Sequence, residues 1–158
     1  MKTIQSSIEV RQPVTTVYNQ WTQFEEFPQF MEGVNKVRQL DDQRLHWETE
    51  IGLAEREFEA EITEQEPDKV IAWRAIGDTK HAGRVTFEPA GTEATRVNVE
   101  MAYDPEGFVE KAGDALGLID KRVDGDLKRF KEMIESRGTE SGAWRGEINE
   151  SGPTTDLR

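Results

Sequence analysis

A strict two-residue alternation of apolar and polar side chains runs through most of the middle of this chain. In EFEAEITE, residues 57–64, Phe58, Ala60 and Ile62 alternate with polar residues, most of them glutamate. Such alternation is typical of antiparallel strands with one buried face and one solvated face. The same period predicts further strands in RLHWETEI (44–51), VIAWRAI (70–76), GRVTFE (83–88) and TRVNVEMAY (95–103).

The period changes after Asp104-Pro105, where apolar residues begin to recur every three or four positions. We expect one amphipathic helix from about 106 to 137, ended by Gly138 and roughly 48 Å long at 1.5 Å per residue. Its apolar stripe must cover the apolar face of the sheet. The stripe consists of Phe108, Ala112, Leu116, Ile119, Val123, Leu127, Phe130 and Ile134.

Two glycines in this segment leave its continuity open. Gly113 and Gly117 lie four residues apart, and each costs a helix interior about 1 kcal/mol relative to alanine. They indicate either a close approach to a neighbouring element or a break near residue 114. A break would place a hinge beside any space between helix and sheet.

The N-terminal part predicts one strand, at residues 3–10, followed by two short helices. Pro13 occupies a favoured first-turn position, and Pro28 divides the stretch that follows. We therefore expect helices at roughly 13–22 and 24–30. The predicted fold class is α+β, with a curved antiparallel sheet of about six or seven strands wrapped on the long C-terminal helix.

Domain organisation follows from length and from the composition of the C-terminal end. The chain has 158 residues, which is typical of one domain. We expect this domain to span residues 1–138. Residues 139–158 are polar and rich in glycine and serine, so we expect them to form a flexible tail.

Composition excludes or disfavours several classes of protein. The chain lacks cysteine, so disulfides, thiolate metal sites and a cysteine nucleophile are excluded. The net charge of -12 disfavours binding to nucleic acids. No stretch approaches the roughly 20 apolar residues of a membrane span, and the first ten residues lack a signal-peptide core. We expect a cytoplasmic protein with no integral membrane association.

Together these stretches resemble the SRPBCC superfamily, which has the START-like helix-grip fold, in its bacterial polyketide cyclase/dehydrase branch. The resemblance implies a cavity between sheet and helix. It implies little about activity, because the superfamily includes lipid carriers, hormone receptors, quinone-binding proteins, cyclases and co-chaperones. It rests on SIEVRQPVTTVYNQWTQFEEFPQFMEGVNKV, LHWETEI, EITEQEPDKVIAWRAIG, GRVTFEPAGTEATRVNVEMAYDPEG and DLKRFKEMIESRG, from about residue 3 to 138, and on GAWRG at 142–146.

The stretch FEEFPQFMEGV, residues 24–34, gathers large apolar side chains around Pro28. In the resembling family this region lies near one end of the long helix, so its side chains either line a cavity mouth or pack as core. Inward residues of the sheet and helix complete the expected ligand-binding set. The set consists of Phe27, Phe30, Met31, Trp47, Thr49, Trp73, Phe87, Tyr103, Leu116 and Ile119.

The sequence offers few polar residues at positions suited to catalysis or metal binding. The alternation places His46 and His81 on an outer face or in a loop, and two distant histidines make a weak metal site. The strand glutamates are interpreted as a solvated acidic face. Trp73 is expected to point inward and Arg74 outward, although the opposite phase would bury Arg74. We expect no metal ion and no cofactor.

Three functions remain open. The first, which we favour, is binding of a small hydrophobic molecule (a lipid, quinone or polyketide-like compound) in a largely apolar cavity. The second is a polyketide aromatase/cyclase or dehydratase, for which Ser6, Thr49, Tyr103 and, in the opposite strand phase, Arg74 are the inward polar candidates. The third is a protein-interaction or co-chaperone-like module that docks through GAWRG. The oligomeric state is left open.

Overall fold

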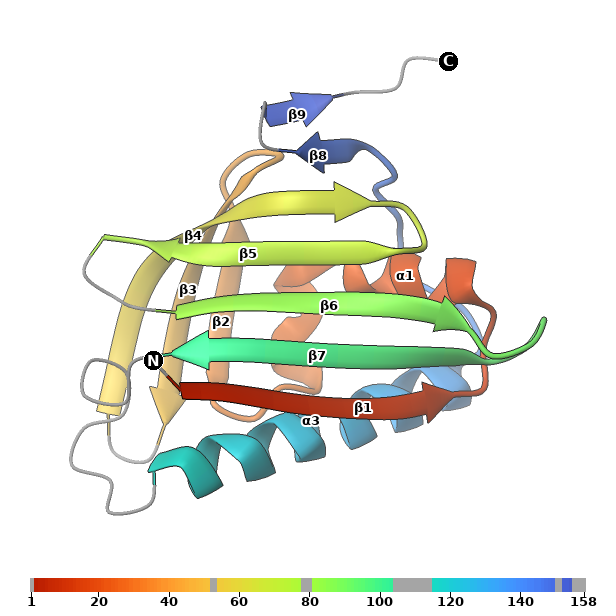
Figure 1. The fold of residues 1–158 in the computed structure, drawn as a ribbon, viewed down its shortest axis with the longest axis horizontal. Helices are drawn as coiled ribbons and strands as arrows, with labels where there is room; N and C mark the ends of the chain where they lie inside the picture. Colours follow the sequence, from red (N-terminus) through yellow and green to blue (C-terminus); the bar gives the residue numbers. More distant parts are fainter. Residues whose placement is uncertain (1, 52–53, 78–80, 104–114, 150–151, 155–158) are drawn as a thin grey trace.

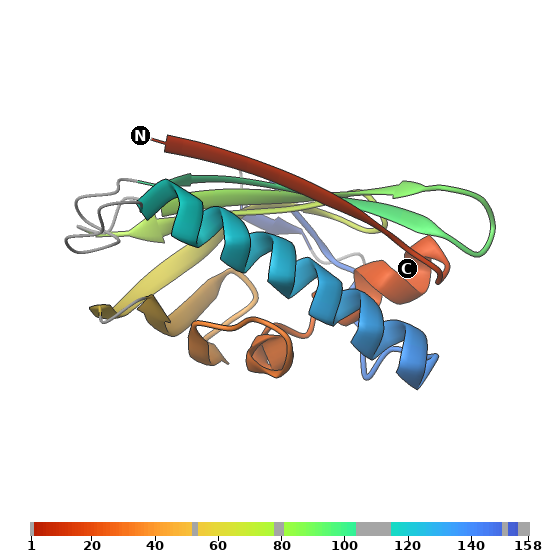
Figure 2. The same cartoon turned by 90° about the horizontal axis from the view of Figure 1, so that it is seen from below.

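The computed structural model describes residues 2–51, 54–77, 81–103, 115–149 and 152–154. One antiparallel sheet has the strand order β1-β7-β6-β5-β4-β3-β2, and α3 lies across its inner face (Figure 1, Figure 2). The α+β class, the curved sheet and the two short early helices are therefore confirmed. The elements are β1 (Lys2–Val10), α1 (Val14–Trp21), the 3-10 helix η1 (Phe24–Gln29), β2 (Val34–Gln39), β3 (Arg44–Ile51), β4 (Ala54–Glu66), β5 (Val70–Ile76), β6 (His81–Pro89), β7 (Thr95–Tyr103), α3 (Ala115–Arg137), β8 (Glu147–Asn149) and β9 (Gly152–Thr154). No helix in the described parts of the chain is long and apolar enough to span a membrane.

The sheet bends along β4, its longest strand (Figure 1). Ile62 pairs with Trp73, whereas Glu64 pairs with Ala72, so Thr63 is an extra residue on β4. A bulge of this kind bends the strand and increases its twist. The bend turns the inner faces of β3 and β5 toward each other and leaves space between the sheet and α3.

The apolar stripe of α3 docks the helix on the sheet and on the two short helices. Val123, Leu127, Phe130 and Ile134 are buried, as the helical period predicts. The Phe130 ring lies 4.7 Å from the ring of Trp21, measured between centroids. Full burial of one such side chain contributes about 1.5–3 kcal/mol, so packing of the stripe is the main force that holds α3 in place.

The predicted hinge cannot be located in this structure. Gly113 lies outside the described residues, as does the expected helical segment from 106 to 114. Gly117 lies within α3. The break near residue 114 therefore stays a prediction.

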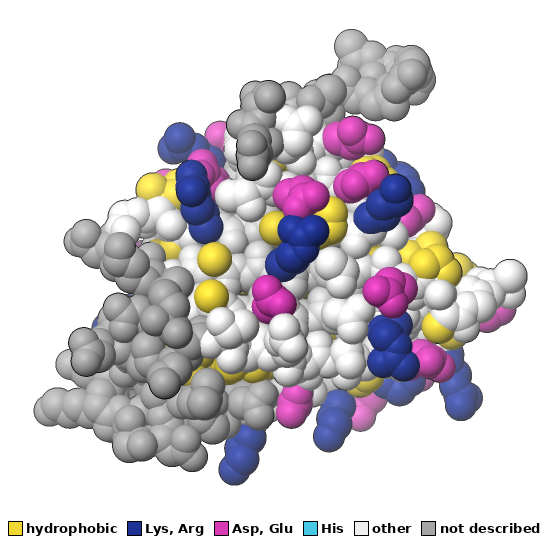
Figure 3. All heavy atoms as spheres, in the orientation of Figure 1, with side chains coloured by type: hydrophobic (Ala, Val, Ile, Leu, Met, Phe, Trp, Pro, Cys, Tyr) yellow, Lys and Arg dark blue, Asp and Glu magenta, His cyan; other side chains and the backbone are white. Residues whose placement is uncertain are grey.

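The outer face of the sheet carries interspersed acidic and basic side chains (Figure 3). Arg74 points outward, and its Nη2 lies 2.6 Å from Glu61 Oε1 on the neighbouring strand. Arg84 makes a similar ion pair with Glu64 at 2.5 Å. These pairs replace like-charge repulsion among the glutamates with cross-strand attraction, which supports the prediction of a solvated outer face.

Residues 139–149, part of the predicted tail, contact the domain, and we call them the C-terminal strap. Ile148 of β8 is buried and pairs with Gln65 at the end of β4, beyond the last residue that β3 reaches. Arg145 forms two hydrogen bonds with Asp68, at 2.8 and 3.1 Å, and its guanidinium lies over the ring of Tyr18. The prediction relied on composition, which does not show that one isoleucine and one arginine of this segment have partners on the domain.

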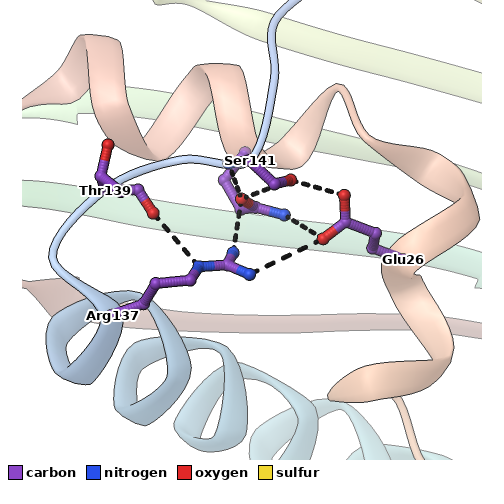
Figure 4. Close-up of polar contacts among 5 residues, drawn as sticks. Glu26, Arg137, Thr139 and Ser141 are labelled. Atoms are coloured by element: carbon purple, nitrogen blue, oxygen red, sulfur yellow. Dashed lines mark hydrogen bonds and ion pairs between the residues drawn. The ribbon is translucent and has the colours of Figure 1, made fainter.

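A buried glutamine anchors the beginning of the strap. Gln20 of α1 is fully buried, and its Oε1 accepts hydrogen bonds from Arg137 Nη2 at 2.6 Å and from the Ser141 backbone N–H at 2.9 Å. Ser141 Oγ donates to Glu26, which also pairs with Arg137 (Figure 4). The end of α3, the strap and the two short helices are thus joined through one amide side chain.

Candidate functional site

A cavity of about 110 Å³ lies between α3 and the inner face of the sheet. Alternation brings two side chains from each of β3, β6 and β7 to its wall, and residues of α3 close the other side. Nearly all of the surface that surrounds the space is apolar. The aromatic and aliphatic residues of the lining are Trp21, Phe27, Met31, Val34, Trp47, Phe58, Trp73, Val85, Val99, Met101, Val123 and Leu127, and the others are Glu32, Gly33, Thr49, His81, Arg122 and Asp126.

The structure brings together five of the ten residues that the sequence predicted as ligand-binding. Phe27, Met31, Trp47, Thr49 and Trp73 line the cavity. Phe27 also packs against Trp47, with ring centroids 5.7 Å apart, so this part of the cavity wall is continuous with the core.

Three of the other predicted residues are buried away from the lining, and the side chains of two are not described. Phe30, Phe87 and Tyr103 are buried but lie outside the lining. Phe30 packs on Phe130, and Phe87 packs on Tyr18, so both belong to the core between α1, η1 and α3. The side chains of Leu116 and Ile119 lie outside the described part of the structure.

Trp73 reaches the cavity because its strand partner is a glycine. Trp73 pairs with Gly83 across β5 and β6. A Cβ at Gly83 would lie only 2.2 Å from the indole ring of Trp73, so the ring covers the position where another residue would have a side chain. The neighbour Arg74 consequently points away from the cavity, as predicted.

His81 corrects the sequence prediction, which placed it on an outer face or in a loop. It is buried in the cavity wall, 5.7 Å from the Phe58 ring and 6.2 Å from the Trp73 ring. Burial lowers its pKa to about 4, so the imidazole is neutral at pH 7. The alternation of Val85 and Gly83 continues back to residue 81, and this signal could have placed His81 inside.

The solvent-facing side of the cavity is held by polar contacts between α3 and the segment after η1. Asp126 accepts hydrogen bonds from Arg129 Nη2 at 2.5 Å and from the Glu32 backbone N–H at 2.9 Å. Arg129 Nε also donates to the Phe30 carbonyl at 2.9 Å. Burial raises the pKa of Asp126 to about 6 despite these contacts. Sequence reasoning missed Asp126 because it concentrated on apolar positions of the stripe, although Asp126 directly precedes Leu127.

The polar residues that the sequence suggested for catalysis are not gathered at one point. Thr49 lines the cavity, but Arg74 is on the outer face and Tyr103 is outside the lining. Ser6 of β1 hydrogen-bonds to the carboxylate of Asp124 on α3. The polar groups that do belong to the lining are instead Thr49, His81 and those of α3 and the segment after η1.

One group of side chains on the outer face has the composition of a metal site. His46 Nε2 lies 3.1 Å from Glu57 Oε1, and possible ligand atoms of His46, Glu48 and Glu57 all lie within 4.8 Å of one another. These residues alternate away from the cavity, with Trp47 and Phe58 on the opposite face. The group therefore has no role in the cavity.

Comparison with known proteins identifies the family. A family model described as "Polyketide cyclase / dehydrase and lipid transport" matches residues 10–132. The chain belongs to this family. A relative from Streptomyces lincolnensis, described as an uncharacterized 17.2 kDa protein in the melC2-rnhH intergenic region, is 48% identical over 149 residues, which are 94% of this chain and 99% of the relative.

Solved structures show that this family member has the START-like helix-grip fold, as the sequence predicted. The Zhui aromatase/cyclase from Streptomyces sp. R1128 superposes with a TM-score of 0.72 at 14% identity, over 90% of this chain and 99% of that chain. A START superfamily protein from Mycobacterium smegmatis superposes with a TM-score of 0.66 at 17% identity, over 85% and 95%. The C-terminal strap of this family member lies beyond the residues that the family model matches.

Proposed function

We propose that this protein binds a small hydrophobic molecule in the cavity between the sheet and α3. The observation that supports this most is the almost wholly apolar lining, which includes the aromatic side chains of Trp47, Phe58 and Trp73. Apolar cavities of about 150 Å³ bind benzene. A cavity of about 110 Å³ therefore suits one small ring or a short acyl segment. Lipid transport in the family description agrees with such a ligand.

The first test is mass spectrometry of the purified protein, native and after denaturation with organic extraction. A molecule of low mass that copurifies in near-stoichiometric amount supports the proposal and names the ligand class. Protein that is free of bound molecules is then titrated with phenylbutanol, a neutral probe with one ring, and binding is followed by calorimetry.

Variants locate the binding in the cavity. Val99→Phe adds bulk to the lining, whereas the control Asn98→Phe introduces the same side chain at the neighbouring residue, which does not line the cavity. We expect Val99→Phe to lose phenylbutanol binding by at least about tenfold, because the ring has no space left. Equal binding by both variants would place the ligand elsewhere and contradict the proposal.

A polyketide aromatase/cyclase or dehydratase is the second candidate. Two observations favour it: Asp126 at the cavity has a pKa raised to about 6, and the Zhui aromatase/cyclase has the same fold. A carboxylate with a pKa near the working pH is suited to proton abstraction. The test is turnover of a poly-β-keto thioester by two variants. Loss of turnover in Asp126→Asn, with turnover kept in Asp124→Asn, would support this function. Equal turnover by both variants would exclude Asp126 as the base.

A further inference from the structure

The lining of the cavity is apolar inside but includes charged residues at its edge. Glu32, Gly33, Arg122 and Asp126 belong to its lining but, unlike Trp47 in the wall, none of the four is buried. We call these four residues the rim. A ligand that fills the apolar part of the cavity meets charged side chains where it approaches solvent.

The two acids of the rim share one cation that lies outside the lining. Arg129 Nη2 lies 2.5 Å from Asp126 Oδ1 and 3.4 Å from Glu32 Oε2. The same guanidinium is held by the Phe30 carbonyl through Nε. Two of its three nitrogens are thus engaged by the protein itself, and Arg129 does not belong to the lining of the cavity.

Arg122 is the cation of the rim that remains. In the described part of the chain it forms no ion pair or hydrogen bond, although its charge acts on Asp126, one helical turn away, and lowers the pKa of that carboxyl against the larger effect of burial. Its side chain is half-buried. A half-buried guanidinium is a strong and geometrically specific partner for a carboxylate, because it can donate two parallel hydrogen bonds.

Gly33 explains how this guanidinium reaches the rim. Its backbone has a φ of +92°, which favours glycine. A Cβ at this position would lie 2.6 Å from Arg122 Nη1, so the guanidinium occupies the space that a side chain would take. The glycine therefore keeps Arg122 close to the entrance between β2 and α3.

We propose that the ligand of this cavity is a carboxylic acid, with its apolar ring or chain inside the cavity and its carboxylate paired with Arg122. This inference rests on the proposed binding function and assigns the chemical class of the ligand. The protein as a whole repels acids, since its net charge is -12. A preference for an acid over a neutral analogue would then come from a local cation, and Arg122 is the basic side chain among the described residues of the lining.

The test compares phenylbutanoate with phenylbutanol, which has the same ring and chain length but no charge. Calorimetry on the full-length protein at neutral pH and low salt gives both affinities. We expect the acid to bind about three- to tenfold more tightly, as a partly exposed ion pair allows. Added salt should weaken binding of the acid and leave binding of the alcohol unchanged.

Two variants with the same change of charge decide whether Arg122 causes the preference for the acid. Arg122→Gln should bind acid and alcohol equally, while its unchanged affinity for the alcohol shows that it is folded. Lys121→Gln, at the exposed neighbouring position, should keep the preference of the unaltered protein. A preference that survives in Arg122→Gln, or is lost equally in both variants, overturns the inference.

The outcomes separate this inference from the function on which it rests. If the unaltered protein binds acid and alcohol with equal affinity, the cavity is a binding site but the assigned ligand class is wrong. If it binds neither compound, the proposed function fails and this inference fails with it.

Discussion

Trp73 and Gly83 show how one missing side chain shapes the cavity wall. The indole ring lies where the Cβ of any other residue at position 83 would be. We expect Gly83→Ala to displace the ring and to lower the free energy of unfolding by about 1–3 kcal/mol, as overpacking does. Urea denaturation measures the loss. The same substitution in a Trp73→Val background should cost much less, and equal costs in both backgrounds would show that the ring is not the cause.

His81 and Asp126 give opposite contributions to stability as pH changes. The pKa of His81 is lowered from 6.5 to about 4, so its contribution is full above pH 6.5 and is lost as pH falls toward 4. The pKa of Asp126 is raised from 3.8 to about 6, so its contribution is full below pH 3.8 and is lost as pH rises through 6. When the pH falls from about 7 to 5, His81 lowers the free energy of unfolding by about 2 kcal/mol, and Asp126 raises it by about 1 kcal/mol.

Variants at these two positions should separate the contributions. His81→Phe keeps an aromatic ring beside Phe58 and Trp73, and we expect it to become more stable as pH falls from about 7 to 5, by about 1 kcal/mol. Asp126→Asn should lose about 2 kcal/mol over the same range. Urea denaturation at both pH values measures this. Parallel pH profiles for the two variants would contradict the assignment.

At the scale of elements, one residue stabilises a junction of three segments. These are α1, the end of α3 and the strap. Gln20 is fully buried and accepts hydrogen bonds from both Arg137 and Ser141. We expect Gln20→Ala to lower the free energy of unfolding by about 2–3 kcal/mol, because it empties a fully buried position and removes the acceptor of two hydrogen bonds, one of them from the charged Arg137. The control Gln5→Ala removes an exposed contact with Glu100 and should cost less than about 0.5 kcal/mol. Equal losses would show that the junction is not held by Gln20.

For the whole molecule, the strap should contribute to stability although it lies beyond the family match. Ending the chain at Gly138 removes the buried Ile148 and the pairing of Arg145 with Asp68. We expect this truncation to lower the free energy of unfolding by about 3 kcal/mol, mainly through lost apolar burial. Ending the chain at Asn149 keeps both contacts and serves as the control. Equal urea midpoints for the two truncations would contradict this role.

The elements of this protein could be predicted from the sequence more fully than its site. The period-two pattern predicted β3 to β7 and the helical stripe predicted α3. Two short helices were expected where α1 and η1 lie, although Pro28 is inside η1 and not between the two helices. For the site, the pattern indicated which residues point inward, including Trp47 and Trp73. It did not separate inward residues that line a cavity from those, such as Phe30 and Phe87, that fill the core.

The sequence by itself determined the face of each strand and the stripe of the helix, because side-chain direction depends on the local backbone and repeats with its period. Only the tertiary structure decided where apolar side chains leave space, since that depends on the bulge in β4 and on how α3 crosses a bent sheet. The same holds for the burial of His81, for the hydrogen bonds by which Asp126 and Arg129 hold Glu32 and Phe30 of the segment after η1, and for the docking of the strap. Each of these depends on the distance between segments far apart in the chain, which no local period records.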